Sequence, residues 1–262
     1  MNIKKLTLIF VVFLFNSSIG LSQAQSVDRD VIFQNSTIDA LLDGIYDGDI
    51  TFAALKNRGD FGIGTFDALD GEMIGVDGKF YQIKTDGIAY PVDDEAITPF
   101  AVVTFFDLDK TVLLDDVTNI SSLKQYIDEF LPTDNIFYAI KIEGVFDYIK
   151  TRSVPRQDKP YKKLIEVVKD QVVFEFEKAE GTIIGFRAPA FVKGVNVPGY
   201  HFHFITKDKK AGGHLLECSM KDIKVEIDET LAFSLVLPES EDFYKLDLEE
   251  DKKEALHTVE SK

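Results

Sequence analysis

The sequence predicts an α+β (mixed α/β) fold: two sheet-based subdomains of mixed and antiparallel strands with a few short helices. Segments with strand patterns outnumber those with helical patterns. Strands and helices rarely alternate along the chain, which favours mostly antiparallel sheets. Of the 262 residues, 45% are apolar, so the chain can bury a substantial core in one large domain or two small ones.

Four short helices are predicted from capping residues and stop signals. Gly44 ends the first of them, and Pro132 stops the third, which is amphipathic. The predicted helices are 36–44, 51–56, 121–131 and 160–169.

Strands are predicted where apolar and polar residues alternate between turn signals. Residues 76–83 predict a hairpin with Asp77 and Gly78 as its two-residue turn. Gly144 is interpreted as the point where two antiparallel strands meet. The predicted strands are 136–144, 145–154, 101–106, 172–176 and 181–186, with further strands around the histidines described below and within 218–237.

The first 24 residues carry the pattern of a secretory signal peptide. Lys4 and Lys5 precede a short apolar run over 6–15, and small residues follow up to Ala24. We expect cleavage after Ala24 and export to the periplasm or the medium, with no membrane attachment afterwards. The rest divides into an N-terminal sheet subdomain, 25–132, and a C-terminal sheet subdomain, 133–262, that carries the metal site proposed below and the C-terminal tail.

Charge and cysteine content exclude some functions. The formal net charge is −16, so binding to nucleic acid or to an anionic membrane through general electrostatics is not expected. The single Cys218 permits no internal disulfide. It lies four residues after His214 and is a conceivable metal ligand, but an isolated cysteine is more often a small buried apolar residue. Cys218 is therefore left out of the site.

Three of the four histidines lie within fourteen residues of each other. His201 and His203 are two apart, so on a strand both point to one face, while Phe202 and Phe204 point to the other. A turn-like segment over 206–213 allows His214 to fold back beside them. Such imidazoles can also be solvent-facing or satisfied by a carbonyl. Three of them without an obvious fourth ligand, however, indicate a catalytic zinc with an open coordination position.

Two charged residues are candidates for chemistry beside the metal. Glu72 stands among glycine and apolar residues, where desolvation raises a carboxyl pKa and suits it to proton transfer, although an exposed turn acid fits the local sequence equally well. Arg152 follows a strand and can clamp a carboxylate with two hydrogen bonds. A surface salt bridge is the alternative for Arg152, and Arg156 and Arg187 are equally admissible from composition.

Three segments together resemble bacterial α-acetolactate decarboxylase. They are GTFDALDGEMIGVDGKFYQI at 64–83, KTRSVPRQDKPY at 150–161, and GYHFHF at 199–204 with GGH at 212–214. Their order and intervals agree with the family, and the similarity runs from about residue 36 to the C-terminus.

The resemblance implies a zinc enzyme that converts (S)-2-acetolactate into (R)-acetoin and carbon dioxide. It implies His201, His203 and His214 as ligands of Zn²⁺, and catalytic roles for Glu72 and Arg152. The family also places a tail glutamate in the site, for which Glu260 is the best match, with Glu254 possible. A dimeric two-domain α/β structure and exported members are further features of the family.

Two other interpretations remain open from the residues. A cupin-type metalloenzyme also has His-x-His on a strand and a later histidine, but its usual glutamate shortly after the second histidine is missing from the sequence ITKDK at 205–209. An exported zinc-binding structural module belongs to a different class. Structural zinc usually has four protein ligands, and no convincing fourth is present.

Overall fold

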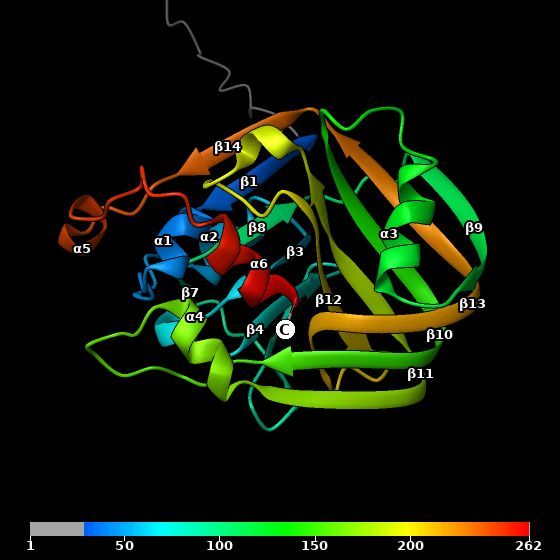
Figure 1. The fold of residues 1–262 in the computed structure, drawn as a ribbon, viewed down its shortest axis with the longest axis horizontal. Coiled ribbons are helices and arrows are strands. Elements are labelled where there is room, and N and C mark those ends of the chain that lie inside the picture. Colours follow the sequence, from blue (N-terminus) through cyan, green and yellow to red (C-terminus); the bar gives the residue numbers. More distant parts are fainter. Residues whose placement is uncertain (1–28, 262) are drawn as a thin grey trace, which may run out of the picture.

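Two large sheets form the body of the structure, a computed structural model that describes residues 29–261 (Figure 1). The predicted signal peptide and its cleavage after Ala24 lie outside the described residues. The predicted fold class is confirmed, because most regular elements are strands in mixed and antiparallel sheets and the helices are short. Within 29–261, no helix is long and apolar enough to span a membrane.

A seven-stranded mixed sheet contains most strands of the N-terminal half. Its one parallel pair joins β1 to β14, and its other pairs are antiparallel. In spatial order the strands are β14 (Ala232–Val236), β1 (Val31–Asn35), β8 (Ala101–Thr104), β3 (Phe61–Thr65), β4 (Glu72–Val76), β5 (Lys79–Ile83) and β6 (Ala89–Pro91). The predicted hairpin is confirmed: Val76 pairs with Lys79, and Asp77 and Gly78 both have the positive φ that a type I′ turn requires.

A five-stranded antiparallel sheet carries the histidines. Its order is β10 (Phe137–Ser153), β11 (Val172–Ala188), β12 (Gly199–Thr206), β13 (Gly212–Thr230) and β9 (Lys110–Val117). An additional pairing of β10 with β13 closes β10 to β13 into a cycle, so neither β10 nor β13 leaves a long open edge there. A separate pair joins β2 (Ile50–Thr51) to β7 (Ile97–Thr98).

The prediction of two strands around Gly144 is wrong. Residues 137–153 form one continuous strand, and the segments predicted at 172–176 and 181–186 are likewise one strand, β11. Gly144 lies opposite Gly181, and a Cβ at Gly144 would come within 2.2 Å of Ile223 Cδ1. The glycine therefore permits close side-chain packing within a strand, and in sequence alone this looks like a turn signal.

Short helices flank the sheets. They are α1 (Ile38–Leu42), α2 (Phe52–Lys56), α3 (Ile120–Asp128), α4 (Leu164–Val167), α5 (Glu241–Tyr244) and α6 (Lys253–Ser261), with 3₁₀ turns at Asp67–Leu69, Val168–Asp170 and Ala190–Val192. The first three confirm predicted helices, and the Thr37, Thr51 and Asn119 side chains cap them. The fourth predicted helix begins later than expected, because Lys163 is extended.

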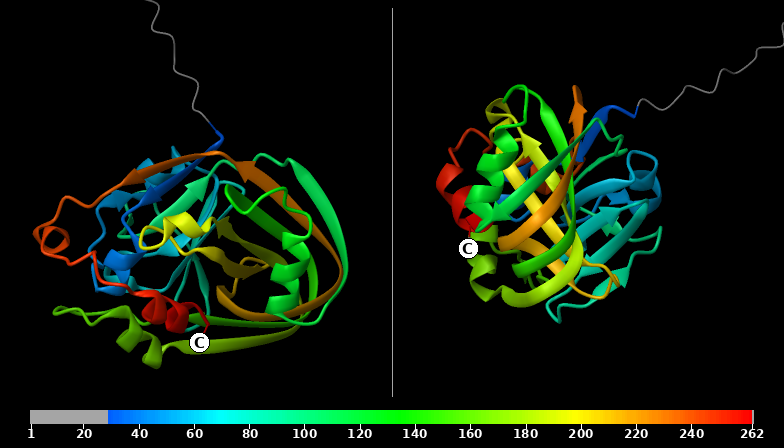
Figure 2. Two further views of the ribbon diagram at one scale, coloured as in Figure 1. Left: turned by 45° about the horizontal axis from the view of Figure 1, so that its top comes forward. Right: turned by 90° about the vertical axis from the view of Figure 1, so that its right-hand side faces the viewer.

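The two sheets exchange strands across residue 132. β9 precedes this residue but belongs to the five-stranded sheet, and β14 follows it but pairs with β1. Figure 2 shows β14 running beside the N-terminal strands. Sheet membership thus does not follow the predicted division into 25–132 and 133–262. The largest apolar cluster includes Ile63, Ile74, Ile184 and Phe186, so it joins the two sheets into one core.

Candidate metal and catalytic site

The β12–β13 hairpin brings the three predicted histidines together. His203 lies directly opposite His214 in the antiparallel register, and His201 lies two residues before His203. One ring nitrogen of each histidine can serve as a ligand atom, and these three atoms all lie within 4.8 Å of one another. Phe202 and Phe204 are buried on the other face, as the alternation predicts.

A glycine lets the third histidine reach this position. Gly213 has φ +146°, and a Cβ there would lie 2.5 Å from the backbone oxygen of Arg152. The absence of a side chain allows β13 to approach β10 closely where His214 pairs with Arg152. The close packing of β13 against β10 therefore explains why a glycine stands directly before His214.

Burial holds the three imidazoles in the neutral form, which keeps a lone pair on one ring nitrogen of each. Burial lowers the pKa of His201 to about 3, with the positive charges of Arg152 and Lys124 adding to the effect. Burial also holds the pKa values of His203 and His214 well below the usual range. Neutral imidazole is the form that binds a metal ion.

The hydrogen bond of His203 identifies its ligand atom. His203 Nδ1 lies 2.8 Å from the backbone oxygen of Met73, so Nδ1 carries the proton and donates it. Nε2 then carries the lone pair, and this atom is buried without a hydrogen-bond partner, as is His214 Nε2. His201 Nε2 lies 3.1 Å from His214 Nδ1. Buried ring nitrogens that converge with unused lone pairs can be satisfied by a divalent cation such as zinc.

Glu72 and Arg152 form a buried ion pair beside the histidines. Arg152 Nη1 lies 2.5 Å from Glu72 Oε1, and the two side chains are 5% and 7% exposed. Glu72 Oε2 lies 3.8 Å from His203 Nε2. Burial raises the pKa of Glu72 to about 7, against the opposing charge of Arg152. Both residues are thus buried, and the alternatives of an exposed turn acid and a surface salt bridge are wrong.

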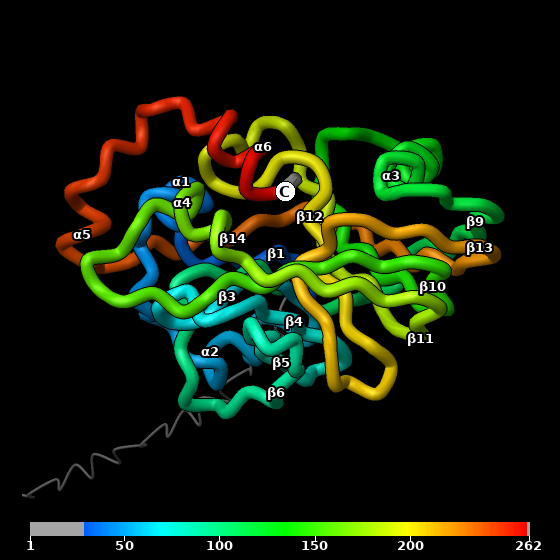
Figure 3. The backbone as a smooth tube through the Cα atoms, turned by 60° about the horizontal axis from the view of Figure 1, so that its bottom comes forward, coloured from blue at the N-terminus to red at the C-terminus, as the bar shows by residue number. Residues whose placement is uncertain are grey.

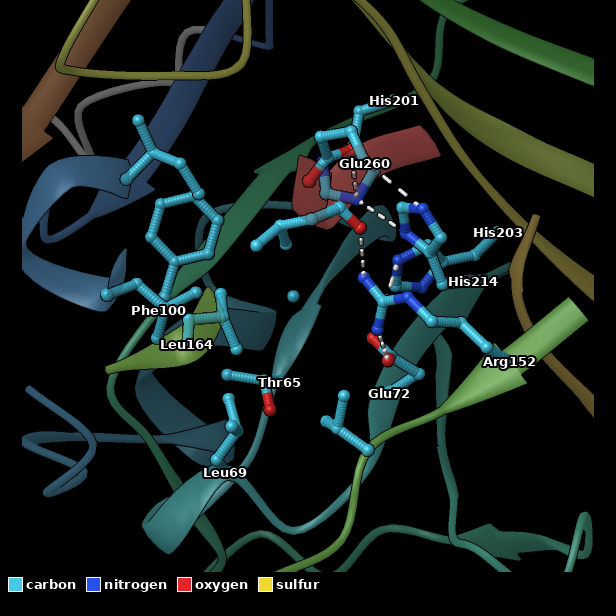
Figure 4. A pocket seen from close by; sticks show the side chains of 15 residues that line it. Thr65, Leu69, Glu72, Phe100, Arg152, Leu164, His201, His203, His214 and Glu260 are labelled. Carbon is cyan, nitrogen blue, oxygen red and sulfur yellow. Dashed lines mark hydrogen bonds and ion pairs between the residues drawn. The ribbon is translucent and has the colours of Figure 1, made fainter. Parts of the chain in front are cut away.

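Glu260 reaches the site from the last turn of α6. Its Oε2 lies 3.7 Å from His201 Nε2 and 3.9 Å from His214 Nε2. Burial raises the pKa of Glu260 to about 7, while the positive charges of Arg152 and Lys124 lower it. Glu254, the other tail candidate, is exposed at the start of α6. Figure 4 shows Glu260 on the side of the imidazoles and Glu72 on the far side of Arg152.

The other candidates lie elsewhere. Arg156 is exposed and pairs with Asp67, and the buried Arg187 pairs with Asp128 and Asp134. Cys218 is fully buried in the apolar cluster of the five-stranded sheet, as expected for a cysteine outside the site. Strand β13 carries an extra residue near Leu216, because Leu215 pairs with Thr151 and Glu217 with Lys150. This bulge reverses the alternation between His214 and Cys218.

The histidines, Glu72, Arg152 and Glu260 line one pocket with a partly apolar wall. The space inside the pocket and at its mouth that is free of protein atoms measures about 400 Å³ and includes some open solvent. The remaining lining residues are Ile38, Leu41, Gly64, Thr65, Leu69, Phe100, Val154, Leu164 and Val259. Figure 4 shows Phe100, Leu164 and Leu69 across the pocket from the imidazoles. The pocket therefore has one polar side and one apolar side, which suits a small, partly apolar acid.

Sequence reasoning missed several of these residues. Thr65 belongs to the first motif segment, so the motif itself was a signal for it. The apolar wall residues on α1 and α4 have the same sequence pattern as core residues. Lys124 on α3 affects the pKa of His201 and of Glu260, and burial lowers its own pKa. Nothing near Lys124 in the sequence distinguishes it from a solvated helix residue.

The chain is similar to known proteins over most of its length. The family model of alpha-acetolactate decarboxylase matches residues 32–250. An alpha-acetolactate decarboxylase from Methanosarcina mazei is 54% identical over 231 residues, which cover 88% of this chain and 80% of the relative. One from Bacillus subtilis is 43% identical over 218 residues, 83% of this chain and 86% of the relative. The crystal structure of alpha-acetolactate decarboxylase from Bacillus subtilis superimposes with a TM-score of 0.86 at 41% identity, covering 88% of this chain and 100% of that chain.

Proposed function

This chain belongs to the alpha-acetolactate decarboxylase family, and we propose that it converts (S)-2-acetolactate into (R)-acetoin and carbon dioxide in the histidine pocket. The observation that supports this most is the grouping of three neutral imidazoles, one guanidinium and two carboxyl groups around a single small cavity. The cupin and structural-zinc interpretations explain neither the family match nor the two carboxyl groups.

The proposed reaction removes the carboxylate of a β-keto acid. The bond between C1 and C2 breaks, and its electron pair moves toward the C3 ketone oxygen, which leaves carbon dioxide and an enediolate. A proton then adds to C2 and gives acetoin. The protein must hold the carboxylate, stabilise the charge that develops on oxygen, and deliver one proton to one face.

Arg152 is the proposed carboxylate-holding group. Its Nε is buried and has no hydrogen-bond partner, and its Nη2 makes only a 3.3 Å contact with the backbone oxygen of Val259. These donors are available for a substrate carboxylate while Nη1 stays paired with Glu72. A held carboxylate keeps the breaking bond aligned with the ketone π system.

His201, His203 and His214 are proposed to hold Zn²⁺. A divalent cation on neutral imidazoles supplies a Lewis acid for the negative charge on the ketone oxygen. Zinc is the preferred identity because its sites commonly combine three protein ligands with an open position, although such sites can also take cobalt or manganese. The carbonyl of Met73 fixes the orientation of the His203 ring that this requires.

Glu260 is proposed as the proton donor. Glu72 is in direct contact with the guanidinium of Arg152, which favours its ionised form. Burial raises the pKa of both carboxyls to about 7, so their pKa values do not distinguish them. Glu260 is proposed because Glu72 Oε1 is held 2.5 Å from Arg152 Nη1, whereas the Glu260 carboxyl lies at the more exposed end of the site, 3.7 Å from His201 Nε2. Glu72 would then hold Arg152 in place as its counter-ion.

The test is acetoin formation and carbon dioxide release from 2-acetolactate, measured on one purified sample. We expect both products in equal amounts, with (R)-acetoin as the main enantiomer. Glu260→Gln keeps the size of the side chain and removes its acid, so it should lose most activity. Unreduced acetoin formation by this variant would rule out Glu260 as the donor and leave Glu72.

We further propose that the chain is exported and forms a homodimer. The order of charged, apolar and small residues over 1–24 supports export. β14 is an edge strand of the seven-stranded sheet. Leu231 just before it and Val236 at its end are 73% and 44% exposed, which suits contact with a second copy. Light scattering of the mature protein tests the dimer, and N-terminal sequencing of exported protein tests cleavage after Ala24.

A further inference from the structure

The carboxylate of Asp43 binds two lysines from distant parts of the chain. Asp43 Oδ1 lies 3.0 Å from Lys163 Nζ, and Oδ2 lies 3.0 Å from Lys252 Nζ. The Lys252 side chain is 5% exposed and also donates to the backbone oxygen of Asp247 at 3.0 Å. Since Asp43 caps the C-terminus of α1, a single carboxylate connects α1 to both lysines.

Each connected element supplies part of the pocket wall. Lys163 caps the N-terminus of α4, and Lys252 directly precedes α6. Figure 3 shows α1, α4 and α6 on the same side of the molecule, and α4 contacts both of the others. The wall residues are Ile38 and Leu41 from α1, Leu164 from α4, and Val259 and Glu260 from α6.

Contacts at both ends of α6 add to its packing against α4 and the apolar core. α6 has nine residues, and an isolated helix of that length is only marginally stable in water. A lysine at a helix N-terminus opposes the helix dipole, so helix stability does not explain the buried Lys252. Its contacts with Asp43 and Asp247 do. At the other end, Val259 is buried and its carbonyl accepts a hydrogen bond from Arg152.

The distance along α6 makes the first contact important for the last residue. Glu260 follows Lys252 by eight residues, which is about 12 Å along a helix. A small tilt at the start of α6 therefore displaces the Glu260 carboxyl, and a misplacement of about 1 Å can reduce a rate by as much as ~100-fold. Among the three histidines, Glu72, Arg152 and Glu260, the Glu260 side chain is the most exposed at 16%, so α6 ends at the pocket mouth.

We propose that Asp43 is a positioning residue that holds α6 against α1 through the buried Lys252 and so fixes Glu260 beside the imidazoles, while its pair with the 56% exposed Lys163 contributes little. This inference rests on the proposed role of Glu260 and adds the group that sets its position. Asp43 touches none of the reacting atoms in this account.

Lys252→Met in the full chain is the direct test, with Lys193→Met as its matched control. Lys193 also binds the segment before α6, through Asp251 at 2.8 Å, but its side chain is 53% exposed. For Lys252→Met we expect kcat/KM to fall by ~10- to 100-fold, and (S)-acetoin to rise as protonation becomes less selective. Amide exchange should increase over 253–260, with metal content unchanged. Lys193→Met should stay within about twofold of the parent, since an exposed ion pair contributes little.

Three results would overturn the proposal. One is equal kcat/KM and equal exchange over 253–260 for the two variants. Another is a loss of activity in Lys252→Met that is matched by loss of metal or by faster exchange throughout the sheets. The third concerns the double variant Asp43→Asn/Lys252→Met, which removes both members of the buried pair and is used if Lys252→Met does not fold. Parental kcat/KM and parental stereochemistry in this folded double variant would also overturn the proposal.

Glu260→Gln separates this proposal from the proposed function. If Glu260→Gln keeps full activity, the catalytic role of Glu260 is wrong, and the exchange over 253–260 alone decides whether Asp43 positions α6. If Glu260→Gln is inactive while Lys252→Met matches Lys193→Met, the proposed function stands and the role of Asp43 is wrong.

Discussion

Replacing Arg152 with methionine removes the guanidinium of the pocket while keeping much of the side-chain bulk. The change leaves Glu72 buried without its 2.5 Å partner. Removing one member of a buried ion pair typically costs about 3–5 kcal/mol of folding stability, because a charge is left uncompensated. Glu72 then takes up a proton, which limits the loss. Both effects belong to the fold and say nothing about catalysis.

The catalytic effect of the same change is expected to be separate. Loss of a charged hydrogen-bond donor to the substrate carboxylate costs about 1.5–3 kcal/mol. At 1.36 kcal/mol per factor of ten, this is a fall of ~10- to 150-fold in kcat/KM. The double variant Glu72→Gln/Arg152→Met has no unpaired buried charge, so its stability should recover toward that of the parent while its activity stays low.

Urea unfolding and acetoin formation on the same four proteins complete this double-mutant cycle. The expected result is a large interaction energy in stability together with low kcat/KM whenever Arg152 is absent. Unchanged kcat/KM in a folded Arg152→Met variant would refute the carboxylate role. Arg156 and Arg187 pair with Asp67 and Asp134 and do not line the pocket, so neither is placed to replace it.

Three further changes test other parts of the account. Burial, with Asp109, Asp30 and Asp107 nearby, raises the pKa of Asp228 from 3.8 to about 7. The folded protein therefore binds this proton more tightly than the unfolded chain, and the free energy of unfolding should fall as pH rises between those values. Asp228→Asn should remove that decline in urea unfolding, and an unchanged decline would contradict this explanation. Gly213→Ala places a Cβ 2.5 Å from the Arg152 carbonyl oxygen, so we expect a loss of roughly 1–3 kcal/mol of folding stability and weaker metal retention. Parental stability and parental metal retention would show that the close approach of β13 to β10 is not needed. Deleting residues 255–262 removes Glu260 and should abolish stereoselective acetoin formation with the histidine hairpin still folded, whereas (R)-acetoin at the parental rate would exclude a catalytic tail.

The sequence predicted the histidine group because its geometry is local. Period-two alternation sets His201 and His203 on one face, and a short turn returns the chain to His214, so no long-range information is needed. Glu72 and Arg152 are 80 residues apart, and their contact depends on how β4 meets β10. Only the resemblance to a family suggested that they share a site.

Non-local pairing accounts for what the sequence did not reveal. Exchange of β9 and β14 between the sheets leaves no signal in the strands themselves, because pairing partners do not alter the alternation of a strand. A glycine that admits Ile223 and a glycine at a turn have the same letter, which explains the error at Gly144. Ile38, Leu41 and Leu164 form a pocket wall by virtue of what they face, and their apolar character alone indicates only burial.

Metal content measured alongside acetoin formation shows whether the histidine pocket works through a bound cation. We expect about one divalent cation for each parent chain, a proportional loss of metal and activity during chelation, and neither metal nor activity in His203→Ala. Recovery of activity when zinc is returned to the stripped parent, but not to His203→Ala, is part of the same expectation. Full acetoin formation by metal-free protein would contradict it.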